Sequence, residues 1–146
     1  MKARMSDSAG QMSDPAVSPV ERYERGLALK QAGLHNAAID QFEMAAVETS
    51  VTLKAYAQIG LCYKLSGCYE EAVPAFRKAL NVATASSKET VQILYVLGRT
   101  LESLGRVAET LEAYRWIRRE DPDYQDVTER IERLSSRRPT VAVKKS

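Results

Sequence analysis

One pattern of small and aromatic residues occurs three times in the chain, and its spacing limits the fold more than any other feature. The middle copy holds Gly60, Gly67, Ala72, Phe76 and Ala79. The same slots hold Gly26, Gly33, Ala38, Phe42 and Ala45 34 residues earlier, and Gly98, Gly105, Thr110, Tyr114 and Ile117 38 residues later. We expect the four extra residues near positions 83–87. A period of this length predicts a stack of repeated units.

Each unit is predicted to be a pair of helices, because the apolar spacing is helical and strand signals are almost absent. The first helix starts clearly: Ser18 is followed by Pro19 and, three positions after the serine, by Glu21, which is the order of a capping box. We expect first helices near 19–32, 53–66 and 87–104, and second helices near 35–48, 69–83 and 107–120.

Glycine has two predicted roles in each unit. Gly33, Gly67 and Gly105 fall where a first helix must end, and a residue at that place often takes a positive φ. Gly26, Gly60 and Gly98 fall inside a helix, where glycine costs about 1 kcal/mol relative to alanine. We expect a close approach between the paired helices at these positions to offset this cost.

The two ends of the repeated region differ from its centre. Val127, Ile131 and Leu134 share one face of a predicted capping helix near 124–135, and we expect Trp116 to pack under it. Polar Arg22 and Arg25 suit a terminal unit that faces water. The expected organisation is a disordered segment (1–17), a folded domain (18–135, with repeats about 19–52, 53–86 and 91–124) and a basic flexible tail (136–146).

The three units resemble the tetratricopeptide repeat. The middle unit carries the closest likeness, in Tyr56, Ile59, Gly60, Tyr63, Gly67, Tyr69, Ala72, Phe76 and Ala79, and Asp121-Pro122 closes the third. The first unit departs from the pattern at Arg22 and Arg25, and the third at Thr110 and Ile117. The resemblance implies an all-α fold, a right-handed α-solenoid of three helical hairpins plus a capping helix.

Residues that could perform catalysis are scarce. Cys62 and Cys68 do not form a C-x-x-C motif, and His35 is the single histidine, so we interpret all three as packing or surface residues. Nucleotide-binding motifs are absent. We therefore predict no enzyme activity, no cofactor and no metal site, and we expect small-molecule substrates to be unlikely partners.

Composition and charge narrow the location and the partner class. No apolar run is long enough for a membrane span, and the first residues lack the apolar core of a signal peptide, so we expect a cytoplasmic protein without a membrane partner. The net charge of +2 makes nucleic acid an unlikely partner.

In such repeats the first helices line a concave groove, and this implies a binding surface. Ala57, Gln92 and Val96 lie on the faces of the first helices that are expected to line this groove. The predicted partner-binding residues are Tyr23, Leu27, Lys30, Lys54, Gln58, Leu61, Lys64, Tyr95 and Arg99. Their chemistry suits a protein or peptide segment with apolar anchors and some acidic residues. Tyr23, Leu27, Gln58, Gln92 and Val96 occupy the positions that some family members use to clamp a chaperone tail, and none has the required type.

The leading functional prediction is a non-enzymatic adaptor or scaffold that binds an extended or helical protein segment in this groove. A small chaperone for an exported or assembling client protein is the first alternative. An RNA-binding helical-repeat protein is the second, on the ground of the basic tail.

Overall fold

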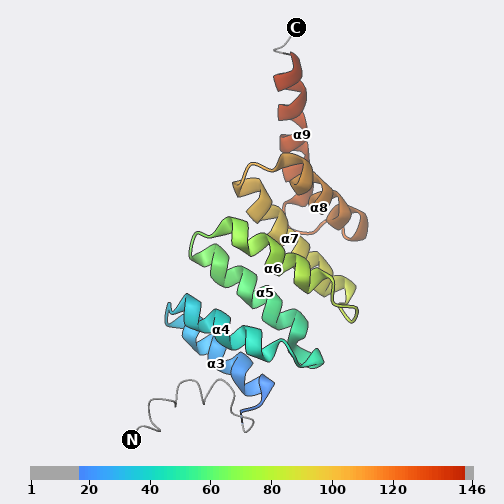
Figure 1. Cartoon of the computed structure of the whole chain (residues 1–146). Helices are drawn as coiled ribbons and strands as arrows, with labels where there is room; N and C mark the ends of the chain where they lie inside the picture. Colours follow the sequence, from blue (N-terminus) through green and yellow to red (C-terminus); the bar gives the residue numbers. More distant parts are fainter. Residues whose placement is uncertain (1–16, 144–146) are drawn as a thin grey trace, which may run out of the picture.

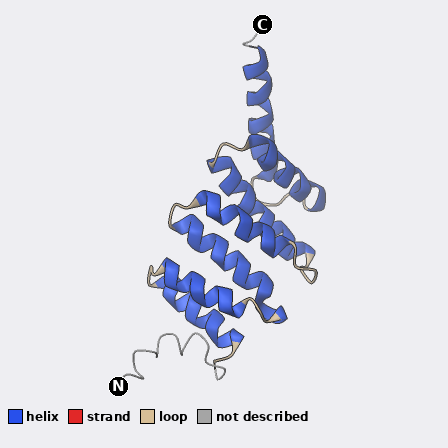
Figure 2. Ribbon diagram, viewed as in Figure 1, coloured by secondary structure: helices blue, strands red, loops and turns tan. Residues whose placement is uncertain are grey.

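Seven helices make up the part of the chain that the structure, a computed structural model, describes: residues 17–143, with side chains to residue 136. No strand occurs among these residues (Figure 2). The helices are α3 (Pro19–Gln31), α4 (His35–Ala45), α5 (Thr49–Leu65), α6 (Tyr69–Leu80), α7 (Ser87–Ser103), α8 (Val107–Glu120) and α9 (Val127–Val143). The all-α prediction is confirmed.

The helices form three antiparallel hairpins that stack in chain order. Figure 1 shows α3–α4 at one end, α5–α6 and α7–α8 above it, and α9 at the other end, so that the elements are ordered in space as in sequence. Three apolar clusters follow the same order, and they centre on Phe42, Phe76 and Tyr114. Each of these rings is at most 1 % exposed. The architecture is therefore the predicted α-solenoid.

Both predicted roles of glycine are confirmed. Gly67 has φ +79° just past the end of α5, where its N–H donates to Lys64 and the next N–H donates to Tyr63. This bond pair is a Schellman motif, which satisfies carbonyls that the helix end would leave unpaired. Gly60 instead lies against Phe76: a Cβ atom there would be 2.5 Å from the ring atom Cε1.

The helix boundaries agree with the predictions to within a few residues, except at two places. Helix α5 begins at Thr49, four residues before the predicted start, and the loop 81–86 holds the predicted extra residues. The capping helix runs from 127 to 143, whereas we predicted its end at 135 and a flexible tail beyond. The helix therefore continues beyond Leu134, where the apolar periodicity of the sequence ends.

The predictions for the N-terminal end concern the segment 1–17 and the two arginines of the first helix, Arg22 and Arg25. The segment 1–17 was predicted to be disordered, and residues 1–16 lie outside the described part. Arg22 was expected to face water, yet only 5 % of it is exposed, whereas Arg25 is exposed as predicted. Arg22 occupies the slot of Tyr56 and Leu94, which are themselves half-buried against the apolar clusters, and this position explains its burial.

Candidate functional site

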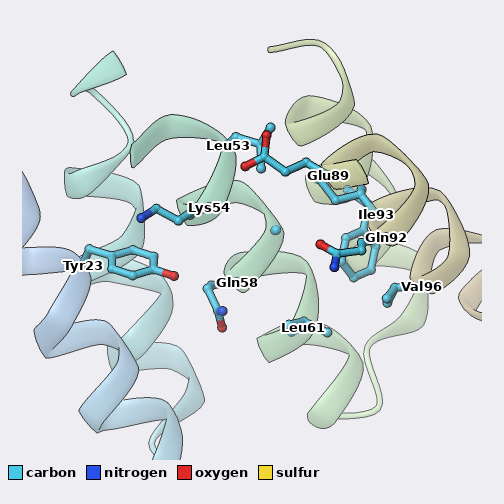
Figure 3. A pocket seen from close by; sticks show the side chains of 11 residues that line it. Tyr23, Leu53, Lys54, Gln58, Leu61, Glu89, Gln92, Ile93 and Val96 are labelled. Carbon is cyan, nitrogen blue, oxygen red and sulfur yellow. The ribbon is translucent and has the colours of Figure 1, made fainter. Parts of the chain in front are cut away.

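A hollow of about 350 Å³ opens on the side of the stack formed by the first helices, α3, α5 and α7, and we refer to this side as the concave groove. Its lining residues are Tyr23, Leu53, Lys54, Ala57, Gln58, Leu61, Phe76, Glu89, Gln92, Ile93 and Val96. Figure 3 shows Tyr23, Lys54 and Gln58 on one side of the hollow, and Gln92, Ile93 and Val96 on the other. The hollow therefore spans the junction of the three hairpins.

The middle repeat leaves this hollow open because it has a small residue in a slot that is aromatic in both neighbours. Tyr23 packs against Phe42 with ring centroids 5.4 Å apart, and Tyr95 packs against Tyr114 at 6.2 Å. The equivalent residue of the middle repeat is Ala57, which sits beside the ring of Phe76. Phe76 thus forms part of the floor without a covering ring.

Four cations surround the groove, and none of them has an acidic partner within 4.0 Å among the described residues; they are Lys30, Lys54, Lys64 and Arg99. The Lys30 ammonium donates to the Gln58 carbonyl oxygen at 2.7 Å, and the Lys54 ammonium lies 5.5 Å from the centre of the Tyr23 ring. Partial burial, together with the charge of Arg99, lowers the pKa of Lys64. The groove therefore carries four basic side chains without an ion-pair partner among the described residues, and Glu89 is the one acidic residue that lines the hollow.

The predicted binding residues divide between the hollow and its surroundings. Tyr23, Lys54, Gln58 and Leu61 line the hollow. Leu27 packs against the first apolar cluster, and Lys30 reaches the groove through its bond to Gln58.

Tyr95 lies outside the hollow. Its ring packs against Tyr114 and Tyr124, and its hydroxyl donates to Asp126 at 2.6 Å, so this predicted binding residue is half-buried at the junction with α9. Arg99 lies over the Tyr95 ring, 6.0 Å from its centre.

Four lining residues were not predicted: Leu53, Phe76, Glu89 and Ile93. Leu53 is the neighbour of the predicted Lys54, and Glu89 lies in the first turn of α7, before the predicted residues of that helix. Phe76 was assigned entirely to the core. The signal that could have found the hollow is the series Tyr23, Ala57, Tyr95 at equivalent slots, which shows where a ring is missing.

The opposite side of the stack carries two repeat-related depressions. One lies beside Tyr56, Ile59 and Lys78, and there the Lys78 ammonium sits 5.4 Å from the Tyr56 ring centre. The other has Leu94, Leu97 and Trp116 in the same slots. Trp116 also packs against the third apolar cluster, which contains residues of α7, α8 and α9, and its contact with the capping helix itself stays a prediction.

The described residues offer little for catalysis. Cys62 is buried and Cys68 half-buried, both are free thiols, and burial raises the pKa of Cys62. No group of three potential metal ligands occurs among residues that the structure describes. None of the described helices combines the length and the apolar character that a membrane crossing requires.

Comparisons with known proteins agree with this architecture. Residues 51–119 match the family model described as "Tetratricopeptide repeat". A crystal structure of MamA is similar with a TM-score of 0.72 at 20 % identity, over 93 % of this chain and 76 % of that chain. The Yersinia enterocolitica type III secretion chaperone SycD, solved in complex with a peptide of the translocator YopD, has a TM-score of 0.60 at 17 % identity, over 86 % of this chain and 93 % of that chain. No curated protein matches the sequence significantly.

Proposed function

We propose, from the premise that residues 51–119 belong to the tetratricopeptide repeat family, that the chain is a non-enzymatic adaptor that binds a segment of another protein in its concave groove. The observation that carries this proposal is the apolar hollow surrounded by four cations that form no ion pair with another described residue. Proteins of this family generally bind other proteins and are generally not enzymes.

The chemistry of the groove indicates the partner. The hollow has an apolar lining, formed by Leu53, Leu61, Ile93 and Val96. A partner side chain that covers this lining displaces water from apolar surface, and this favours binding. Lys64 is partly buried and faces Arg99, so a carboxylate placed between them would relieve the repulsion of two like charges. The preferred ligand is an extended or helical protein segment with apolar anchors and acidic residues.

A small chaperone for an exported or assembling client is the second candidate. It is favoured by the likeness to SycD, a secretion chaperone that was solved with a peptide of the translocator YopD. An adaptor and a chaperone could use the same groove. They differ in whether the partner is stable alone, which co-expression of an identified partner with and without this protein would show.

The first test is a selection of random twelve-residue peptides, displayed on phage, against the purified full chain. We expect the selected peptides to be enriched in Asp and Glu. The double variant Lys64→Glu/Arg99→Glu should weaken their binding at least tenfold, because it replaces attraction in the groove by repulsion. Fluorescence anisotropy of labelled synthetic peptides measures the dissociation constants.

The matched control is Arg119→Glu/Arg133→Glu, which changes the net charge equally at two exposed positions of α8 and α9. This control should bind the selected peptides like the wild type. Equal binding by all three proteins, or a stronger effect of the control, would contradict a concave binding site. Circular dichroism of each variant verifies that helicity is retained.

A further inference from the structure

We infer that the hollow over Phe76 is a receptor for one aromatic side chain of the bound segment, which fills the ring position that the middle repeat lacks. This inference rests on the proposed function and specifies its ligand: a segment with an aromatic residue and an acidic residue about three positions away.

The first step of the argument is the comparison of the three repeats. Tyr23 covers Phe42 with ring centroids 5.4 Å apart and an angle of 56° between the ring planes. Tyr95 covers Tyr114 at 6.2 Å and 34°. Both pairs lie in the range at which aromatic side chains attract each other. In the middle repeat Ala57 stands in the covering slot, and Phe76 has no ring partner among the described residues.

The second step is the shape and lining of the space left by Ala57. The hollow has a volume of about 350 Å³, which is within the usual range of pockets that bind organic groups. Leu61 lies on one side of it and Ile93 and Val96 on the other, so an inserted ring would contact apolar side chains of two hairpins as well as Phe76. Tyr23 and Gln58 line the hollow too and place polar groups at the site, where a tyrosine hydroxyl could form a hydrogen bond.

The third step is the position of the cations relative to the hollow. Lys54 precedes Ala57 by three residues and Lys64 follows it by seven on the same helix, which places them about 4.5 Å and 10.5 Å away along the helix axis. An extended segment advances about 3.3 Å per residue. An acidic residue about three positions from the aromatic one would therefore reach Lys64 and Arg99.

The test variant is Ala57→Tyr, which supplies the missing ring from the protein itself. Its matched control is Ala108→Tyr, the same change at an exposed position of α8. We expect the selected peptides to share an aromatic residue, to lose at least tenfold in affinity for Ala57→Tyr, and to bind Ala108→Tyr like the wild type. Replacement of the aromatic residue by alanine in a synthetic peptide should cause the same loss with the wild type and little further loss with Ala57→Tyr.

The outcomes separate this inference from the proposed function. Peptides that bind Ala57→Tyr as well as the wild type, but are lost on Lys64→Glu/Arg99→Glu, would overturn the aromatic receptor and leave the groove as the binding site. Peptides that are insensitive to both variants would overturn both. Selected peptides without a common aromatic residue would also overturn the receptor.

A second measurement does not depend on the library. The probe is p-cresol, which has the ring of a tyrosine side chain, and the readout is the NMR signals of the methyl groups of Leu61, Ile93 and Val96. We expect p-cresol to shift these signals in the wild type and in Ala108→Tyr, and not in Ala57→Tyr. If Ala57→Tyr loses helicity, Ala57→Leu replaces it, since leucine also fills the space and favours a helix. Unshifted signals in the wild type would overturn the inference.

Discussion

At the scale of single residues, the contact between a helical glycine and the ring of the partner helix defines each hairpin. Gly60 is buried in α5 and touches Phe76 of α6, and the same arrangement joins Gly26 to Phe42 and Gly98 to Tyr114. A side chain at the glycine would need the space that the ring occupies. The two residues should therefore depend on each other energetically.

We predict that Gly60→Ala lowers the free energy of unfolding by up to about 2 kcal/mol. Overpacking in a core costs typically about 1–3 kcal/mol, and the higher helix propensity of alanine offsets about 1 kcal/mol of this. Urea unfolding followed by circular dichroism measures the change.

A double-mutant cycle provides the control for this prediction. Phe76→Ala alone should cost about 3–5 kcal/mol, because a fully buried ring is lost. With the ring removed, Gly60→Ala should no longer destabilise the protein and could stabilise it. Additive effects of the two changes would show that the Cβ atom does not meet the ring.

At the scale of elements, polar bonds fix the junction between the last hairpin and α9. Asp126 precedes α9 and accepts from the Tyr95 hydroxyl at 2.6 Å and from Arg130 Nε at 2.9 Å. Arg130 also donates to Glu102 at 2.9 Å, and the same carboxylate oxygen accepts from the Tyr114 hydroxyl. This network links α7, α8 and α9 around side chains that are mostly withdrawn from water.

We predict that the Asp126 carboxylate stabilises the protein at neutral pH and loses this effect in acid. The Tyr95 hydrogen bond and the Arg130 charge hold the pKa of Asp126 below its usual value of 3.8. The folded state therefore binds this proton less readily than the unfolded state, so the stabilisation is complete above about pH 4–5 and disappears as the pH falls through the lowered pKa. Melting temperatures between pH 7 and pH 2.5 measure it.

The comparison for this prediction is Asp126→Asn against Asp123→Asn, which removes the same charge from an exposed neighbour. Asp126→Asn should melt at a lower temperature than the wild type at pH 7, and the difference should shrink in acid. Asp123→Asn should follow the wild type throughout. A constant difference between Asp126→Asn and the wild type over the whole pH range would contradict the assignment.

At the scale of the whole molecule, the stack is elongated and its stability is distributed along it, because each hairpin packs against its neighbours in the chain (Figure 1). The described part of α9 contributes Val127, Ile131 and Leu134 to the last cluster, each at most 4 % exposed. These residues cover Tyr114 and Ile117, which would otherwise face water.

We predict that deletion of residues 137–146 changes the melting temperature by at most about 2 °C, because the last buried residue of α9 among the described positions is Leu134. Deletion from residue 126 onward should instead lower it by more than about 10 °C, because three buried apolar side chains are lost, each worth about 1.5–3 kcal/mol. Differential scanning calorimetry compares the two truncations. A large loss from the shorter deletion would show that the C-terminal residues dock on the stack.

The sequence predicted what the repeat period determines. Gly60, Gly67 and Phe76 have the expected roles because each role depends on contacts inside one unit, and the unit occurs three times. The sequence did not predict the surroundings of Tyr95, because they depend on Asp126 and Tyr124, which belong to the non-repeated junction with α9. The hollow was not predicted for a different reason. Ala57 was considered only as a residue on one helix face, whereas the hollow forms because Ala57 is smaller than Tyr23 and Tyr95, which occupy the same slot in the other repeats.

The order of the hairpins along the chain also affects how fast the protein folds. Contacts in this stack join residues that are near one another in sequence, so that the unfolded chain needs to close only short loops to form them. Proteins with such local contacts fold in microseconds to milliseconds, far faster than proteins of similar size with distant pairings. Because each unit depends only on its neighbours, folding can begin in any hairpin and spread, and the chain can open from either end while the middle hairpin, with Phe76 and Ala57, stays closed.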